Sequence, residues 1–158
     1  MALDRMRRVG TGHRHRIPGT RAEISLFEVP DPQNRPEQHL AAARAQLGKD
    51  RLLGVSCYDR LELALAAREA GADYVAFGSA FPSATKPRAT RAPLSLYREA
   101  KARLGSPVVA IGGITTENAQ SVIEAGVDAV AVISALFDAP DIEAAARSFS
   151  RLFHRKAP

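Results

Sequence analysis

The chain has 158 residues, of which 46% are hydrophobic and 25% charged, and its formal net charge is +5. This length and composition fit one globular domain, and no apolar run reaches the roughly 18 residues that a membrane span needs, so we predict no membrane partner. The single cysteine cannot form an internal disulfide, and the N-terminus lacks the apolar core of a secretory signal, which favours a cytoplasmic location.

Residues 1–39 are predicted to form an irregular, disordered, basic arm. They hold seven arginines and four prolines, and their apolar residues show little periodicity outside ISLFEV at Ile24–Val29. The arginines are a weak sign of nucleic-acid binding, because no aromatic residues alternate with them and no amphipathic recognition helix follows. His13 and His15 are likewise a weak metal site, since the flanking arginines repel cations. We therefore predict no nucleic-acid partner.

Residues 40–158 are predicted to form one domain in which strands alternate with helices. This alternation is the sequence pattern of a parallel α/β sheet. The first strand is RLLGVS at residues 51–56. The helix after it has Asp59 and Glu62 as a predicted N-terminal capping pair, and Gly71 marks its end.

Three further pairs of strand and helix follow. The strand predicted at residues 73–81 leads through a polar loop to a helix that Pro93 opens and Gly105 stops. The strand in PVVAIGG at residues 107–113 precedes the third helix, and the strand in DAVAVISAL at residues 128–136 precedes the fourth. Spacing on one helical face predicts that Ala119, Val122 and Ile123 are buried on the third helix, and Ile142, Ala145, Ala146, Phe149 and Phe153 on the fourth.

The four βα units form two copies of a longer repeat. EAGADYVAFGSA at Glu69–Ala80 aligns with EAGVDAVAVISA at Glu124–Ala135, with eight of twelve positions identical and an offset of 55 residues. Such a repeat builds either an open doubly wound sheet or a (β/α)8 barrel, of which four units are half. The strands RLLGVS and AVAVIS would then have unpaired edges, so we predict either a homo-oligomer, such as a homodimer that closes the sheet, or a poorly soluble chain.

Two adjacent glycines, Gly112 and Gly113, follow the third strand. A loop at the carboxyl end of a parallel strand carries ligands, and glycines there let main-chain amides approach an anion near the start of the next helix. In eight-stranded barrels a phosphate site commonly combines the last two such loops, and Ile133–Ser134 ends the last strand. The pattern therefore favours a phosphate site, with a simple tight turn as the alternative.

Four motifs in order resemble the thiamine phosphate synthase family, within the superfamily that also contains the thiazole tautomerases. They are GVS at residues 54–56, GADYVAFGSAFPSATKP at 71–87, VVAIGGITTENA at 108–119 and AVAVISALF at 129–137. The resemblance covers about residues 41–153 and implies the C-terminal half of a TIM-type (β/α)8 barrel. It also implies a transferase of thiamine biosynthesis, which joins a hydroxymethylpyrimidine diphosphate to thiazole phosphate with Mg²⁺ and releases pyrophosphate.

Site residues carry over from this family one position at a time. The resemblance implies that Ser56 and Lys86 are catalytic and contact the pyrimidine diphosphate, although from its residue type alone Ser56 is equally well a helix cap or a loop hydroxyl. Ser83 stands where the family more often has threonine, which keeps the hydroxyl. The stretch that would hold the thiazole phosphate is Ser83, Ala84 and Thr85, with the main chain of Gly113, Ile133 and Ser134.

The first half of the family's site has no counterpart before Leu40. The family uses a Gln-x-Arg-x-Lys strand, an Asn-Asp pair and a later Asp for diphosphate and Mg²⁺, and none of these occurs there. Glu23, Glu28 and Asp31 lack surrounding strands to position them, so no metal ligand is assigned. The alternative to an enzyme is then a non-catalytic thiazole phosphate-binding module or an inert, truncated chain. A tautomerase is disfavoured, because that chemistry uses a histidine and the matching region has none before His154.

Overall fold

The computed structural model describes residues 12–16, 23–28, 36–83 and 88–154. Six strands form one sheet in the order β1-β2-β3-β4-β5-β6, with β2 to β6 parallel and β1 antiparallel to β2. The strands are β1 Gly12–Arg16, β2 Glu23–Glu28, β3 Leu52–Ser56, β4 Tyr74–Phe77, β5 Val108–Ile111 and β6 Ala129–Ala131, and the helices are α2 Pro36–Leu47, α3 Leu61–Glu69, α4 Leu94–Leu104, α5 Ala119–Glu124, α6 Ser134–Phe137 and α7 Ile142–His154.

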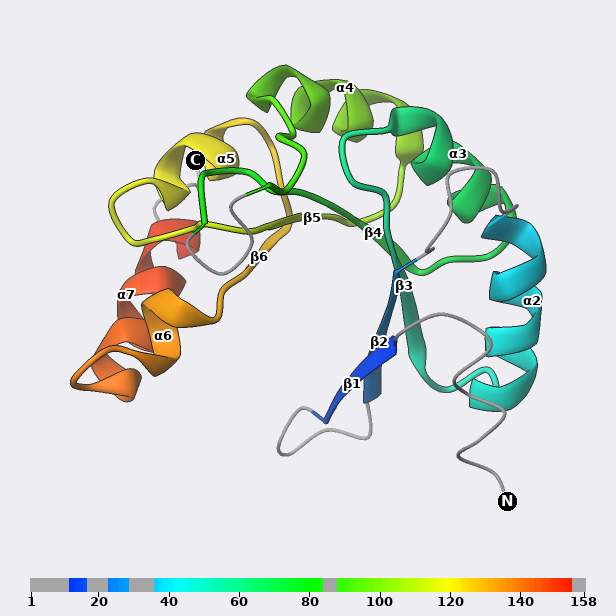
Figure 1. The fold of residues 1–158 in the computed structure, drawn as a ribbon, viewed down its shortest axis with the longest axis horizontal. Coiled ribbons are helices and arrows are strands. Elements are labelled where there is room, and N and C mark those ends of the chain that lie inside the picture. The colour runs from blue at the N-terminus through cyan, green and yellow to red at the C-terminus, as the bar shows by residue number, and fades with distance from the viewer. Residues whose placement is uncertain (1–11, 17–22, 29–35, 84–87, 155–158) are drawn as a thin grey trace.

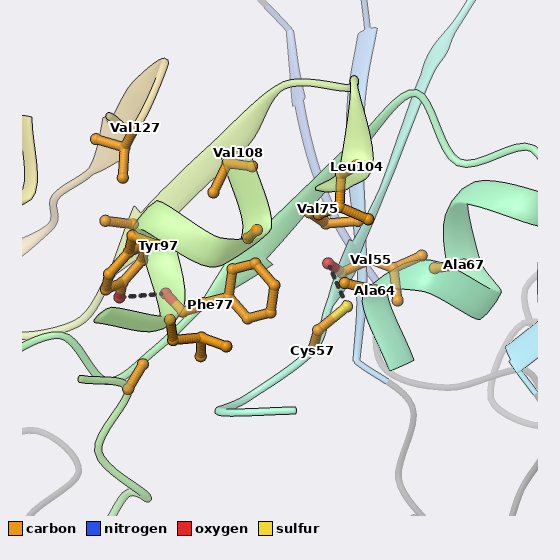
Figure 2. Close-up of a cluster of buried hydrophobic side chains, with 14 of the residues drawn as sticks. Val55, Cys57, Ala64, Ala67, Val75, Phe77, Tyr97, Leu104, Val108 and Val127 are labelled. Atoms are coloured by element: carbon orange, nitrogen blue, oxygen red, sulfur yellow. Dashed lines mark hydrogen bonds between the residues drawn. The ribbon is translucent and has the colours of Figure 1, made fainter. Parts of the chain in front are cut away.

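The sheet curves, and helices α2, α3, α4 and α5 follow its convex side (Figure 1). The hydrophobic core lies between the strands and these helices, as Figure 2 shows for Val55, Val75 and Phe77, which meet Ala64 and Tyr97. Because side chains alternate between the two faces of a strand, the strand residues on either side of each core residue face the concave side of the sheet. Of these, Ala129 and Ala131 of β6 are exposed.

The predicted repeat is present in the strand register. In the first repeat (β3, α3 and β4) Gly54 is paired with Tyr74, and in the second repeat (β5, α5 and β6) Val109 is paired with Ala129, which is the same pairing shifted by 55 residues. The helix signals at Pro93 and Gly105 are also confirmed: α4 has its N-cap at Pro93 and ends at Gly105 with a left-handed φ of +63°.

The prediction of an irregular arm is wrong for residues 12–16 and 23–28, which are strands. β2 pairs in parallel with β3, so RLLGVS is not the unpaired edge that we expected. The physical reason is that an open strand edge offers a row of free N–H and C=O groups, and the β-rich run EISLFE can pair with it. The expected domain boundary at residue 39 also falls inside helix α2.

Two helix starts differ from expectation. Helix α3 has Arg60 as its N-cap with no side-chain capping bond, and Glu62 instead accepts a 2.7 Å hydrogen bond from Arg60 Nε. Ser134 begins the short helix α6, where we predicted only the end of the last strand. Strand β6 ends at Ala131 because its ladder partner Ile111 is the last residue of β5, beyond which the chain turns away.

Helix α7 is less buried than its pattern predicts. Of the five residues expected on its apolar face only Phe149 is buried, and Ile142 is 47% exposed. The reason is that α7 lies at the end of the sheet, against α5 and α6, where no further strand of the described chain extends the surface to cover. No helix among the described residues is long and apolar enough to cross a membrane.

Candidate functional site

The candidate site lies where the parallel strands β3 to β6 end, because their carboxyl ends meet at one edge of the sheet. Ser56 is the last residue of β3 and is 5% exposed. It pairs in register with Ala76 of β4, on the face opposite the helix-covered Val55 and Val75. Ser56 is not a helix cap, since α3 has its N-cap at Arg60. Its hydroxyl therefore stands at the ligand end of the inner face.

The loop after β4 is closed at its base. The Ser79 amide donates to the Thr90 carbonyl at 2.7 Å, and the Ala92 amide donates back to the Ser79 carbonyl at 3.0 Å. The buried Ser79 hydroxyl donates to the Phe81 carbonyl at 2.5 Å. Ser83 is half-buried in this loop. The predicted site residues Ala84, Thr85 and Lys86 lie outside the described residues.

The two glycines after β5 are required by close packing. Gly112 and Gly113 have φ of +89° and +65°, the left-handed region that side chains disfavour. A Cβ on Gly112 would collide with the Ser79 side chain, and one on Gly113 with the carbonyl oxygens of Phe81 and Pro82. The tight-turn explanation thus accounts for both glycines, and it leaves their amide groups available for a second role.

Main-chain hydrogen bonds join the loops after β4 and β5. The Ala80 amide donates to the Ile111 carbonyl at 2.8 Å, and the Phe81 amide donates to the Gly112 carbonyl at 3.1 Å. A trans peptide holds its C=O and N–H in opposite directions, so a bonded Gly112 carbonyl points the Gly113 N–H away from the β4 loop. Within the described chain, the Gly113 amide donates no hydrogen bond.

The loop after β6 contains the remaining predicted residues, Ile133 and Ser134. Ile133 is the N-cap of α6, and its carbonyl accepts hydrogen bonds from the Leu136 and Phe137 amides at 3.0 and 2.8 Å. Its side chain is 75% exposed, which is unusual for an aliphatic residue. The structure therefore locates Ser56, Ser83, Gly113, Ile133 and Ser134 at the carboxyl ends of four adjacent strands.

Two side chains, Cys57 directly after β3 and Tyr74 at the start of β4, are uncharged at neutral pH. Burial raises the pKa of the Cys57 thiol to about 12, and its sulfur contacts the Val55 carbonyl at 3.6 Å (Figure 2). Burial, and secondarily the Asp73 carboxylate, raises the pKa of Tyr74 to about 12. The Tyr74 ring occupies the space that a side chain at Gly54 would need.

Sequence reasoning missed two residues that organise these loops, Ser79 and Asn118. Asn118 Nδ2 donates to the Gly113 carbonyl at 3.0 Å, and Asn118 Oδ1 accepts from the Thr115 amide at 2.8 Å. An asparagine shortly after a pair of glycines is a signal of a side-chain bond to the turn, and it was available in GGITTEN.

Helices along the convex side of a curved parallel sheet, with glycine-bearing loops at its carboxyl edge, define part of a (β/α) barrel. The family model described as thiamine monophosphate synthase matches residues 35–136. The chain belongs to the thiamine monophosphate synthase family.

Curated relatives support the same family. The thiamine-phosphate synthase of Methylobacillus flagellatus is 59% identical over 115 residues, which are 73% of this chain and 54% of that protein. The thiamine-phosphate synthase of Chromobacterium violaceum is 58% identical over 119 residues, which are 75% of this chain and 57% of that protein. The chain therefore spans about half the length of the curated relatives it matches.

A solved structure shows the same fold. The thiamine phosphate pyrophosphorylase from Pyrococcus furiosus superposes with a TM-score of 0.67 at 34% identity, over 82% of this chain and 58% of that one. This likeness confirms the predicted TIM-barrel-like β/α repeat.

Proposed function

We propose that this chain carries the thiazole phosphate-binding half of a thiamine phosphate synthase, a transferase of thiamine biosynthesis. The observation that supports this most is the meeting of two loops at one sheet edge. Gly113 offers an amide directed away from the β4 loop, and Ile133–Ser134 lies at the end of the neighbouring strand. Main-chain amides and the first turn of a helix are the groups with which proteins bind phosphate esters.

In the proposed reaction the thiazole nitrogen attacks the methylene carbon of the pyrimidine, and the bond from that carbon to the diphosphate breaks. This chemistry depends on stabilising a leaving diphosphate more than on a positioned base. We assign that role to Lys86 and Ser56, with Ser56 at the carboxyl end of β3. The thiazole phosphate would contact Ser83, Ala84, Thr85, Gly113, Ile133 and Ser134.

Mg²⁺ does not fit the described residues. Among residues 40–83 and 88–154, whose side chains the structure describes, no group of three or more His, Cys, Asp or Glu side chains could hold a metal ion. A Mg²⁺ site needs oxygen ligands in near-octahedral geometry, so we derive no step through the metal. The absence of the family's Gln-x-Arg-x-Lys, Asn-Asp and Asp patterns before Leu40 leaves a second candidate function, a non-catalytic module that binds thiazole phosphate.

One pair of measurements separates these functions. The purified full chain is given both substrates with Mg²⁺ and thiamine phosphate is quantified, while thiazole phosphate binding is measured in parallel by calorimetry. Turnover with binding supports the enzyme, and binding alone supports the module. Absence of both would mean an inert chain and would overturn the proposal.

We also propose a cytoplasmic homo-oligomer in which a second copy covers the β6 end of the sheet. Strand β6 is an edge of the described sheet, and three large apolar side chains beyond it are exposed: Ile133 at 75%, Phe137 at 62% and Ile142 at 47%. Light scattering of the wild-type chain should give a dimer or larger species, and Phe137→Asp should give a monomer. A wild-type chain that is a folded monomer contradicts this assembly.

A further inference from the structure

The two repeats differ in one hydrogen bond at the ligand end. Tyr58 and Gly113 occupy equivalent positions after β3 and β5, and both have left-handed φ, +53° and +65°. In the first repeat the Tyr58 carbonyl accepts a 2.9 Å hydrogen bond from the Gly78 amide at the end of the neighbouring strand. The residue equivalent to Gly78 in the second repeat is Ile133.

The second repeat does not form this bond between strands. The Gly113 carbonyl accepts instead from the Asn118 side chain at 3.0 Å, and in the described part of the chain the Ile133 amide donates no hydrogen bond. The equivalent of Asn118 in the first repeat is Leu63, whose apolar side chain is buried in the core and cannot act in this way. In the second repeat the Asn118 side chain therefore takes the place of the main-chain amide that donates to the equivalent carbonyl in the first repeat.

Asn118 is placed to do this because it does not cap its own helix. It occupies the N-cap position of α5 without a side-chain capping bond, and its Oδ1 accepts from the Thr115 amide at 2.8 Å. Its own carbonyl accepts from the Ser121 hydroxyl at 2.8 Å. The carboxamide is thus fixed at both ends across the turn that contains Gly113.

The orientation of one peptide follows from this contact. With the Gly113 carbonyl held toward Asn118, the trans peptide directs the Ile114 N–H the opposite way. Buried Ile114 anchors the loop in the core. In the region that the structure describes, neither the Ile114 amide nor the Ile133 amide has an acceptor. Unpaired amides on two adjacent loops are donors suited to an oxyanion.

We propose that Asn118 is a positioning residue that keeps the Gly113 carbonyl away from the Ile133 amide and so reserves that amide for a phosphate group. This inference rests on the proposed phosphate site and assigns its control to a residue outside it. Without Asn118 the second repeat would adopt the arrangement of the first, with the Ile133 amide bonded to the Gly113 carbonyl and lost to the ligand.

The test uses the full chain and inorganic phosphate as the probe. In Asn118→Ala, the dissociation constant for phosphate, measured by calorimetry, should rise at least about tenfold, as expected for loss of a hydrogen bond to a charged group. Hydrogen exchange at the Ile133 amide, measured by NMR without phosphate, should become slower, because that amide gains the Gly113 carbonyl. Unchanged affinity together with unchanged exchange overturns the proposal.

A second variant guards against loss of folding. Asn118→Asp keeps the acceptor for the Thr115 amide but removes the donor to the Gly113 carbonyl. Its matched control is Gln120→Glu, which adds the same charge at an exposed position whose side chain, among the described residues, bonds only Glu124. Phosphate affinity should fall about tenfold further in Asn118→Asp than in the control. Equal losses in the two variants would mean a charge effect and would refute the positioning role.

The same experiments separate this inference from the proposed function. If the wild-type chain binds neither phosphate nor thiazole phosphate, the proposed phosphate site is wrong. The exchange of the Ile133 amide in Asn118→Ala then decides alone whether Asn118 controls that amide. If wild-type binds phosphate and both variants bind equally well, the proposed function stands and the role of Asn118 is wrong.

Discussion

The two repeats agree at the amino ends of their strands and differ at the carboxyl ends. Asp73 accepts from the Leu53 amide at 2.7 Å, and Asp128 accepts from the Val108 amide at 2.7 Å, which is the same contact shifted by 55 residues. At the carboxyl ends, Tyr58 has a side chain, and its carbonyl accepts a hydrogen bond from a main-chain amide after the next strand. Its counterpart Gly113 has no side chain, and in the described chain its carbonyl accepts no such main-chain bond. In barrels of this type, residues at the amino ends of the strands mainly stabilise the fold, and residues at the carboxyl ends bind ligands.

The amino-end contacts also recruit a cation from the preceding helix in each repeat. Arg44 of α2 lies 2.6 Å from Asp73, and Lys101 of α4 lies 2.8 Å from Asp128. Arg44 additionally donates to the carbonyls of Gly48, Arg51 and Gly71 at 2.7 to 3.2 Å. The cation paired with the aspartate therefore contacts more segments of the chain in the first repeat than in the second.

The largest effect is expected at the carboxyl end, from Gly113→Ala. A left-handed alanine costs about 1 to 2 kcal/mol, and overpacking against the Phe81 and Pro82 carbonyls adds about 1 to 3 kcal/mol. Urea unfolding should therefore show a loss of about 3 kcal/mol. Gly48→Ala is the matched control, because Gly48 has φ of +77° with nothing near its Cβ. A loss at Gly113 no larger than at Gly48 would remove the packing argument.

A smaller effect is expected from the two cations at the amino ends. Arg44→Ala should lower the free energy of unfolding by about 2 kcal/mol, since it removes several hydrogen bonds to main-chain carbonyls. Lys101→Ala should cost about 0.5 kcal/mol, because a partly exposed ion pair is weak and screened. Arg103→Ala, which removes the surface ion pair of Arg103 with Glu99, gives the change in unfolding free energy expected for losing an ordinary surface pair.

Salt sharpens this second comparison. In 1 M NaCl the effect of Lys101→Ala should nearly vanish, whereas most of the effect of Arg44→Ala should persist, because bonds to neutral carbonyls are not screened. Equal losses for Arg44 and Lys101 at both salt concentrations would show that the two repeats are held in the same way.

An effect that appears only at alkaline pH is expected through Cys57, which occupies the position equivalent to Gly112. The buried thiol has a pKa raised to about 12, so the unfolded chain releases its proton first as the pH rises. Its contribution to stability is complete below about pH 9 and is lost between about pH 9 and 12, by about 1 kcal/mol at pH 10. Urea unfolding should show a smaller loss for Cys57→Ala over this window. A wild-type chain and variant with identical pH dependence would contradict the burial of a neutral thiol.

Local patterns in the sequence predicted much of the domain. Alternating strand and helix signals, Pro93 and Gly105 around α4, and the buried face of α5 all agree with the structure. The glycine pair was located in the right loop, but its structural cause, contact with the loop after β4, lies about thirty residues earlier in the chain. Patterns of this kind succeed because they report contacts within one helix turn or one strand.

Several features came only from contacts distant in sequence. Strand β2 forms because β3 has an edge with which it can pair. The predicted capping pair of Asp59 and Glu62 is absent because the Glu62 carboxylate accepts a hydrogen bond from Arg60. The bond from Asn118 to Gly113 was likewise invisible to periodicity, since it depends on where a loop turns.

The sequence by itself determined the family, the two repeats and the edge of the sheet at which we propose that a ligand binds, because short-range spacing sets the order of strands, turns and helices. Tertiary structure alone decided which carbonyls and amides are paired at that edge. Each of those pairings depends on the position of another strand, and the amino acid at the site does not reveal it.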